Sequence, residues 1–143
     1  MKRVYVNEEW CLGCHLCEYF CSYANSGIKD MVDALKGKPL SARVAVEGTD
    51  KVTFAVSCRH CETPLCISAC ISGALTKNGD GVVTIDKNKC VGCGSCVMMC
   101  PYGAIEVSDD HVATKCELCT NNSFGTPACV SHCPNGAIVF EER

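Results

Sequence analysis

Alternating apolar and polar residues predict two β-hairpins near the middle of the chain. Residues 74–86 place the turn sequence Asn-Gly-Asp-Gly, at 78–81, between two short segments rich in β-branched and apolar side chains. Residues 43–57 repeat this pattern around Gly-Thr-Asp at 48–50. We therefore expect two small antiparallel hairpins rather than one large sheet.

The stretch of residues 22–40 has no strong hydrophobic periodicity. A short helix near residues 30–36 is the only element we expect there. Gly37 and Pro39 follow it, and both residue types commonly end helices.

A six-residue segment recurs along the second half of the chain. The sequence CPYGAI at 100–105 returns as CPNGAI at 133–138 and, in weakened form, as CISGAL at 70–75. A short extended segment follows each copy. The repeats indicate a duplicated unit, in which we expect a loop, a short helix carrying the last cysteine, and a small strand.

The cysteines fall into four runs of four that use all sixteen cysteines of the chain. The runs are Cys11, Cys14, Cys17 and Cys21; Cys58, Cys61, Cys66 and Cys70; Cys90, Cys93, Cys96 and Cys100; and Cys116, Cys119, Cys129 and Cys133. Proline follows the last cysteine of the third and fourth runs.

The first and third runs have the cysteine spacing of bacterial ferredoxins. In that spacing, three closely spaced thiolates hold one cubane iron–sulfur cluster and the fourth reaches a different cluster. Gly13, Gly92 and Gly94 lie inside these runs, where glycine permits the dihedral angles and close backbone approach that such a loop needs. Electron transfer is therefore the leading function.

Zinc binding and disulfide formation are the alternatives for a chain so rich in cysteine. A structural zinc site takes four ligands from two pairs, which leaves no role for the third and fourth cysteines of a run. Disulfides are typical of exported proteins, and residues 1–10 contain neither an apolar segment nor a cleavage site of the kind a secretion signal has.

Composition agrees with a metal-dependent core. The apolar share of 48% includes the cysteines; without them it is roughly 37%, below the usual 45–50%. Bound clusters would have to replace part of the core, so the metal-free chain should fold poorly.

Charge and hydropathy limit the classes of partner. The formal net charge is −3, and four clusters with their thiolates would bring it to about −11. Since the 13 Lys and Arg residues form no basic block, we expect no nucleic-acid partner. No apolar stretch approaches the roughly 20 residues that span a bilayer, so we expect no direct membrane insertion.

No catalytic constellation is present in the sequence, so we expect a non-catalytic protein. His15, His60 and His132 lie inside cysteine runs, where packing or hydrogen bonding near a cluster is favoured over ligation. Lys89 and Lys115 each precede the first cysteine of a run. Each is expected to be a surface lysine, with a charge that raises a cluster potential as the alternative.

Beyond these motifs, the chain resembles a known family over nearly its whole length. The segments CRHCETPLC at 58–66, KCVGCG at 89–94, KCELC at 115–119 and GTPACV at 125–130 carry the resemblance. They are similar to the four-cluster polyferredoxin subunits of anaerobic oxidoreductases. These include subunits of carbon monoxide dehydrogenase, formate hydrogenlyase, dimethyl sulfoxide reductase and tungsten aldehyde oxidoreductase complexes.

The resemblance implies four [4Fe-4S] clusters and ligation that is crossed between the runs. The four implied ligand sets are Cys11, Cys14, Cys17 and Cys133 (cluster 1); Cys58, Cys61, Cys66 and Cys100 (cluster 2); Cys90, Cys93, Cys96 and Cys70 (cluster 3); and Cys116, Cys119, Cys129 and Cys21 (cluster 4).

The resemblance also implies an α+β fold, a duplicated bacterial-ferredoxin-like arrangement of two two-cluster lobes. Residues 1–143 would form a single polyferredoxin unit. One lobe would combine residues 1–40 with 106–143, which hold the outer cysteine runs, and the other would comprise residues 41–105 with the inner runs.

Three functions are then open. The favoured one is an electron-transfer subunit that relays single electrons between a catalytic oxidoreductase subunit and a redox partner. The catalytic partner would be a molybdenum- or tungsten-pterin enzyme, a hydrogenase or a carbon monoxide dehydrogenase. The alternatives are a free, diffusing polyferredoxin and a zinc-stabilised interaction module. We expect a cytoplasmic protein of an anaerobic host.

Overall fold

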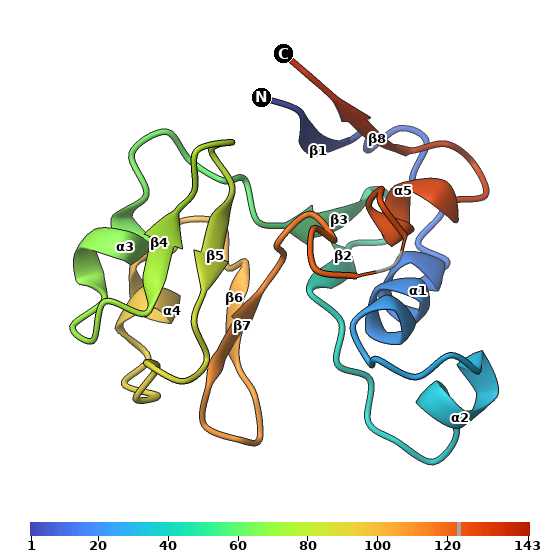
Figure 1. The fold of residues 1–143 in the computed structure, drawn as a ribbon. Coiled ribbons are helices and arrows are strands. Elements are labelled where there is room, and N and C mark those ends of the chain that lie inside the picture. The colour runs from blue at the N-terminus through green and yellow to red at the C-terminus, as the bar shows by residue number, and fades with distance from the viewer. Residues whose placement is uncertain (123) are drawn as a thin grey trace.

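A computed structural model describes residues 1–122 and 124–143 of the chain. Its elements, in chain order, are β1 (Arg3–Val6), α1 (Leu16–Ala24), α2 (Met31–Leu35), β2 (Val44–Gly48), β3 (Thr53–Ser57), α3 (Leu65–Ala69), β4 (Leu75–Lys77), β5 (Val83–Ile85), α4 (Ser95–Met99), β6 (Ile105–Val107), β7 (Ala113–Lys115), α5 (Ala128–Ser131) and β8 (Ile138–Glu141). Figure 1 shows how they are arranged.

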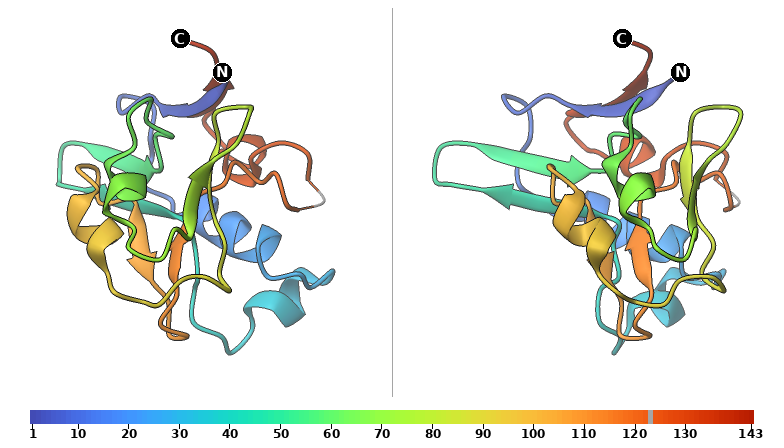
Figure 2. Two further views of the ribbon diagram at one scale, coloured as in Figure 1. Left: turned by 60° about the vertical axis from the view of Figure 1, so that its left-hand side comes forward. Right: turned by 90° about the vertical axis from the view of Figure 1, so that its left-hand side faces the viewer.

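The strands of the described residues form four antiparallel pairs: β1 with β8, β2 with β3, β4 with β5 and β6 with β7. The predicted α+β class with short helices and small hairpins is confirmed. The β2–β3 hairpin projects from the rest of the chain in both views of Figure 2. Its second strand begins at Thr53, because residues 49–52 form the turn, which the Thr49 N–H closes by donating to the Val52 carbonyl at 2.8 Å.

The two ends of the chain meet in the β1–β8 pair. Val4 lies opposite Phe140 and Val6 lies opposite Ile138. The N-terminal amine also forms an ion pair with Glu142. The sequence pattern did not indicate this pairing, which brings the first and last cysteine runs to the same side of the molecule (Figure 1).

The predicted helix at residues 30–36 is confirmed as α2. Asp30 is its N-cap, and its carboxylate accepts hydrogen bonds from the backbone N–H groups of Val32 and Asp33 at 2.8 and 3.1 Å. Such a cap satisfies donors that a helix leaves unpaired at its start.

The expectation that each short helix carries the last cysteine of its run is wrong for three of the four runs. In α3, α4 and α5 the helix carries the third cysteine, and the fourth lies at or beyond the helix end. Proline after Cys100 and Cys133 explains two of these cases, because a residue before proline avoids helical dihedrals. Ile71 follows Cys70, so proline does not account for the end of α3. Among the described helices, only α1 holds both the third and the fourth cysteine of its run, Cys17 and Cys21.

Buried apolar side chains form two separate groups. The first lies among α1, α5, β1, β2, β3 and β8 and includes Val4, Val44, Ala55 and Ile138. The second lies among α4 and β4–β7 and includes Leu75, Val83 and Ile105. Both contain buried cysteines, and in Figure 1 the elements of the two groups gather on opposite sides of the picture.

A buried carboxylate links these two sides. Glu117 Oε1 accepts a hydrogen bond from the Ile85 backbone N–H at 2.9 Å, at the end of β5. Glu117 Oε2 accepts one from Arg43 Nη1 at 3.3 Å, next to the start of β2. Glu117 is 8% exposed, so water cannot easily replace either partner.

We expect Glu117→Ala to destabilise the protein by about 2–3 kcal/mol, because it leaves a buried N–H and a half-buried guanidinium without an acceptor. For a chain of this length, that cost lowers the midpoint of thermal unfolding by about 5–10 °C. Glu106→Ala is the control, since Glu106 is an exposed carboxylate on β6. Equal midpoints for the two variants would contradict the bridging role of Glu117.

Candidate metal centres

The first three cysteines of the first run meet the last cysteine of the chain. The loop that leads into α1 contains Cys11 and Cys14, and α1 itself contains Cys17. These three cysteines line one cavity together with Cys133. Burial, with smaller contributions from Glu18 and the neighbouring thiols, raises the pKa of the Cys17 thiol to about 12. The free space is about 20 Å³, which is room for about one water.

The second run meets the last cysteine of the third. Cys58, Cys61 and Cys66 line a cavity of about 250 Å³ with Cys100. Burial raises the pKa of the Cys66 thiol, and the nearby thiols of Cys58 and Cys100 add to that effect. This cavity is mostly apolar, and Met99 and Tyr102 stand at its wall.

The third run meets the last cysteine of the second. Burial raises the pKa of the Cys96 thiol, and the thiols of Cys70 and Cys90 raise it further. A hydrogen bond with the Ser95 hydroxyl lowers the pKa of the exposed Cys93 thiol, against a smaller opposing effect of Cys70. Cys70 therefore lies beside the third run.

The fourth run meets the last cysteine of the first. Burial raises the pKa of the Cys129 thiol well above its ordinary value, and the thiols of Cys116, Cys21 and Cys119 raise it further. Burial likewise raises the pKa of Cys21, and Cys119 contributes. Cys21 is thus a close neighbour of the fourth run.

Backbone N–H groups donate to several of these sulfurs. Arg43 N–H donates to Cys21 Sγ at 3.2 Å, Ala113 N–H to Cys90 Sγ at 3.4 Å, and Leu118 N–H to Cys116 Sγ at 3.4 Å. Bonds of this type favour the thiolate and tune the potential of an iron–sulfur centre. The donor set therefore fits a thiolate-bound cluster.

The spacing of the sulfurs differs from that of a single-ion site. Among residues 1–122 and 124–143, no three Cys, His, Asp or Glu side chains converge closely enough to ligate one metal ion. The cysteines instead border open spaces. Since burial raises the pKa of both Cys17 and Cys116 to about 12, metal binding must displace protons from these thiols.

His60 has a structural role that its position inside a cysteine run did not reveal. It is fully buried, and its Nδ1 accepts a hydrogen bond from the Val83 backbone N–H at 3.0 Å. Burial lowers the pKa of His60 to about 3, with help from Lys115, Arg3 and Lys77. The ring is therefore neutral and carries its proton on Nε2, which has no hydrogen-bond partner among the described residues.

The two lysines that precede cysteine runs differ from each other. Lys89 is exposed, as expected, with Nζ 3.9 Å from the Asp86 carboxylate. The expectation of a surface side chain is wrong for Lys115, which is 1% exposed. Its Nζ donates to the carbonyl of Val83 on β5 and to that of Cys116 in the fourth run. A single sequence carries no signal for that burial.

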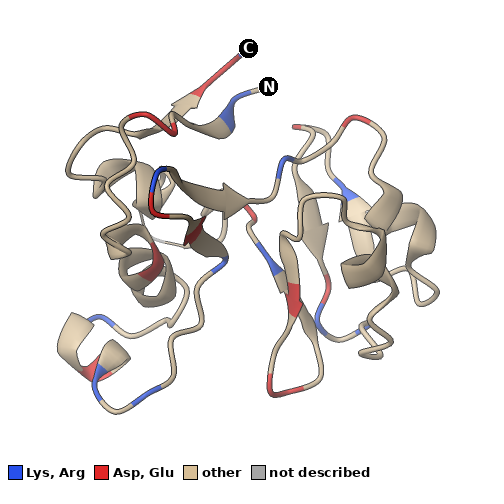
Figure 3. Cartoon of the chain, turned by 180° about the vertical axis from the view of Figure 1, so that it is seen from behind, with Lys and Arg blue, Asp and Glu red and all other residues tan. Residues whose placement is uncertain are grey.

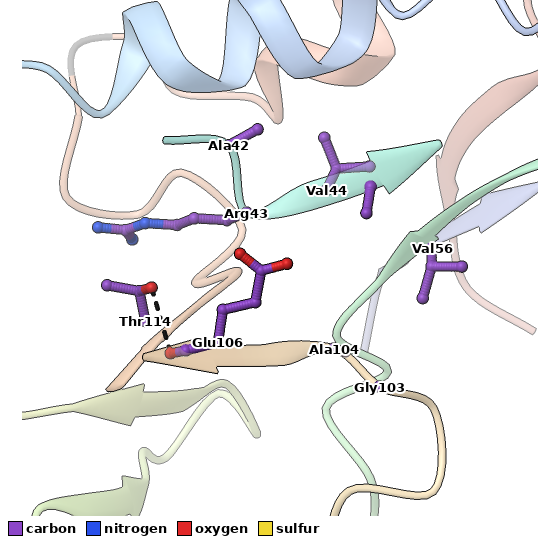
Figure 4. Close-up of a pocket in the computed structure, with 9 residues that line it drawn as sticks. Ala42, Arg43, Val44, Val56, Gly103, Ala104, Glu106 and Thr114 are labelled. Carbon is purple, nitrogen blue, oxygen red and sulfur yellow. Dashed lines mark hydrogen bonds between the residues drawn. The ribbon is translucent and has the colours of Figure 1, made fainter. Parts of the chain in front are cut away.

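A further cavity between the two groups of elements holds no cysteine. Ala42, Arg43 and Val44 line one wall, and Ala104, Glu106 and Thr114 line the other, as Figure 4 shows. The Thr114 hydroxyl is turned back to the Glu106 carbonyl at 3.4 Å. With about 20 Å³ of free space, this cavity fits about one water and no organic substrate.

Two cavities lined by cysteines, together with backbone N–H groups that donate to other cysteine sulfurs, are typical of an iron–sulfur protein. Comparison with known proteins agrees: residues 49–143 match the model of the 4Fe-4S dicluster domain, and residues 8–24 match a 4Fe-4S binding domain. The chain therefore belongs to the 4Fe-4S dicluster domain family. It binds several [4Fe-4S] clusters, and the zinc alternative is wrong.

Relatives of the chain have names that fit electron transfer. It is 40% identical over 130 residues to an iron–sulfur protein of Rhodospirillum rubrum, covering 82% of this chain and 68% of that protein. It is 32% identical over 120 residues to the thiosulfate reductase electron transfer subunit PhsB of Salmonella typhi, covering 80% and 60%. Other relatives are much longer, and the chain spans only 17% of one putative oxidoreductase of Escherichia coli.

A solved structure shares the fold. The chain matches part of the active-site complex BamBC of benzoyl-coenzyme A reductase with a TM-score of 0.55, at 24% identity, over 100% of this chain and 80% of that one. This likeness concerns the fold alone. The family models and the named relatives, by contrast, confirm the predicted family resemblance and make the chain a non-catalytic electron-transfer protein.

Two glycines of the third run have similar backbone dihedrals but different surroundings. Gly92 and Gly94 have similar φ values of +71° and +73°. A Cβ on Gly92 would lie 2.2 Å from the His111 carbonyl oxygen, whereas a Cβ on Gly94 would meet nothing within 4 Å. The Gly92 loop is therefore packed tightly against the β6–β7 turn.

We expect Gly92→Ala to lose the metal centre of the third run, about four irons per chain, because the loop must move away from His111. Gly94→Ala carries only the dihedral cost of about 1–2 kcal/mol and should keep its iron. Iron and acid-labile sulfide analysis of anaerobically prepared protein measures this. Equal iron in both variants would contradict the role of the close approach.

Proposed function

We propose that the chain holds four [4Fe-4S] clusters with ligands crossed between the runs, in the sets implied by the sequence. The two cysteine-lined cavities support the sets that contain Cys133 and Cys100. The effect of Cys70 on the pKa of Cys96, and that of Cys21 on the pKa of Cys129, both added to the larger effect of burial, support the other two. The observation that carries this proposal is that the last cysteine of each run lies near the first three cysteines of a different run.

We further propose two lobes, with boundaries moved from those expected. The β2–β3 hairpin packs against α1 and β1, so it belongs with the outer cysteine runs rather than in a lobe of residues 41–105. The β6–β7 hairpin packs with β4, β5 and α4, so it belongs with the inner runs. The lobes are then residues 1–57 with 116–143, and residues 58–115.

The proposed function is an electron relay between a catalytic oxidoreductase subunit and a redox partner. Each bound cluster would supply a one-electron centre. Cys14 and Cys93, in different lobes, are exposed and bring two of the sites to the surface. Burial is the main cause of the raised pKa of the Cys116 thiol, and the Cys58 thiol of the other lobe adds to it, so the two lobes come close at these thiols.

Several exposed apolar side chains surround the third run. Ile71, Val91 and Met98 are 76%, 64% and 87% exposed. Exposed apolar side chains beside a metal site favour a contact with another protein, and therefore a subunit over a free carrier. Acidic and basic side chains are interspersed along the rest of the chain (Figure 3).

The identity of the catalytic partner stays a prediction. The names of relatives, such as the electron transfer subunit of thiosulfate reductase, support an oxidoreductase. A molybdenum- or tungsten-pterin enzyme, a hydrogenase and a carbon monoxide dehydrogenase are the predicted types. A cytoplasmic location and an anaerobic host also stay predictions. Within the described part of the chain, no helix has both the length and the apolar character needed to cross a bilayer.

A size measurement tests the subunit role. Protein purified anaerobically from its native source should elute from gel filtration as a complex with a larger subunit that carries its own metal or pterin, identified by mass spectrometry and metal analysis. Elution of the iron-loaded chain alone, at the size of a monomer, would instead favour a freely diffusing polyferredoxin.

A cysteine substitution tests the crossed ligand sets. Cys133→Ser should perturb the centre held by Cys11, Cys14 and Cys17, and should leave the one held by Cys116, Cys119 and Cys129 intact. Mössbauer and electron paramagnetic resonance spectra of the variant, compared with those of Cys14→Ser, provide the measurement. The two variants should alter the same signal. If Cys133→Ser instead alters the signal that Cys119→Ser alters, the crossed scheme is wrong.

A further inference from the structure

Lys115 is a buried cation without a carboxylate partner among the described residues. Its Nζ donates to the Cys116 carbonyl at 2.6 Å and to the Val83 carbonyl. The nearby buried carboxylate of Glu117 is already taken by Arg43 and by the Ile85 N–H. Burying an ammonium group is costly unless negative charge lies close by. The burial of Lys115 is therefore favoured by negative charge on a neighbouring group.

Cysteine thiols lie around Lys115, and they can supply negative charge when they bind metal as thiolates. Burial raises the pKa of the Cys58 thiol, and the charge of Lys115 opposes that rise more strongly than any other group does. The same charge opposes the rise at Cys66 and at Cys116, although burial is again the larger effect. The hydrogen bonds agree with this placement. Lys115 binds the carbonyl of Val83, which lines the cavity of Cys58 and Cys66, and the carbonyl of Cys116, which belongs to another ligand set.

Those two sets are the ones that face each other across the lobes. Lys115 ends β7, where the chain crosses from one group of elements to the other (Figure 1). Other cations near this point are less suited to the role. Lys77 lies on the surface and donates to the Cys61 and Glu62 carbonyls, so solvent screens its charge.

We propose that the buried charge of Lys115 raises the reduction potentials of two metal centres, the one that contains Cys58 and the one that contains Cys116. Without that charge both potentials would be lower. The proposal rests on the proposed assignment of the four clusters. Reduction adds one negative charge to a centre, and a cation held nearby in a medium of low dielectric constant stabilises that charge. The electron is then favoured at the crossing between the lobes.

The chain offers a matched control at Lys89. Both lysines directly precede the first cysteine of a run, but Lys89 is exposed and lies near Asp86. A charge in that setting has little effect on a centre because solvent and the carboxylate screen it. A comparison of the two lysines therefore distinguishes the effect of burial from the effect of the position before a cysteine run.

The experiment is an anaerobic redox titration of the iron-loaded full chain, monitored by electron paramagnetic resonance, for the wild type, Lys115→Met, Lys115→Gln, Lys115→Arg and Lys89→Met. Iron and sulfide content is measured on each sample. Lys115→Gln keeps a hydrogen-bond donor without the charge, and Lys115→Arg keeps the charge.

We expect the two neutral Lys115 variants to shift two of the four centres to lower potential. The expected shift is tenfold or more in the one-electron equilibrium constant, which corresponds to 59 mV or more. Lys115→Arg and Lys89→Met should leave all four potentials close to those of the wild type.

Three results would overturn the proposal: unchanged potentials in a fully loaded neutral variant, an equal shift of all four centres, or loss of iron from both neutral variants, which would assign Lys115 a purely structural role. Failure of the cluster assignment is distinguishable, because the wild type itself would then contain fewer than four clusters by iron and sulfide analysis.

Discussion

The burial of thiol groups is the constraint on which the rest of the structure depends. Cys17, Cys21 and Cys129 occupy the first hydrophobic group, and Cys96 occupies the second, at positions that a larger protein would fill with aliphatic side chains. Burial keeps such thiols protonated in the metal-free chain, whereas metal binding requires thiolates. The packing of each group and the binding of metal are therefore one process. Neither group should be well ordered without its metal.

The order of elements follows from the need to bring distant cysteines together. The β1–β8 pair joins the ends of the chain, so that Cys133 reaches the loop of Cys11. Packing of α1 against α5 brings Cys21 to Cys129, and packing of α3 against α4 serves the inner runs in the same way. Glu117 then holds the two sides together through one backbone N–H and one guanidinium. Short local elements suffice because cysteines, the β1–β8 pair and Glu117 together connect the distant segments.

Local sequence predicted the local elements well. The turn residues at 78–81 and at 48–50 specified two hairpins, and Asp30 specified the start of α2, because each of these signals acts over a few residues. The β1–β8 pair and the packing of the β2–β3 hairpin with the outer runs depend on contacts between distant segments, and nothing within the strands themselves encodes those contacts. Lys115 and Lys89 have the same place relative to a cysteine run, yet only one is buried, since burial is decided by the elements around a residue. The candidate ligands could be found from spacing alone, whereas the donors to their sulfurs could not.

The central claim is that each metal centre takes ligands from two cysteine runs. Anomalous diffraction at the iron edge, from crystals of the full chain grown without oxygen, tests it most directly. The account predicts four separate iron clusters, each in contact with three cysteines of one run and one of another, with Cys133 at the cluster of Cys11 and Cys21 at the cluster of Cys129. Four clusters that each contact only the cysteines of a single run would contradict it.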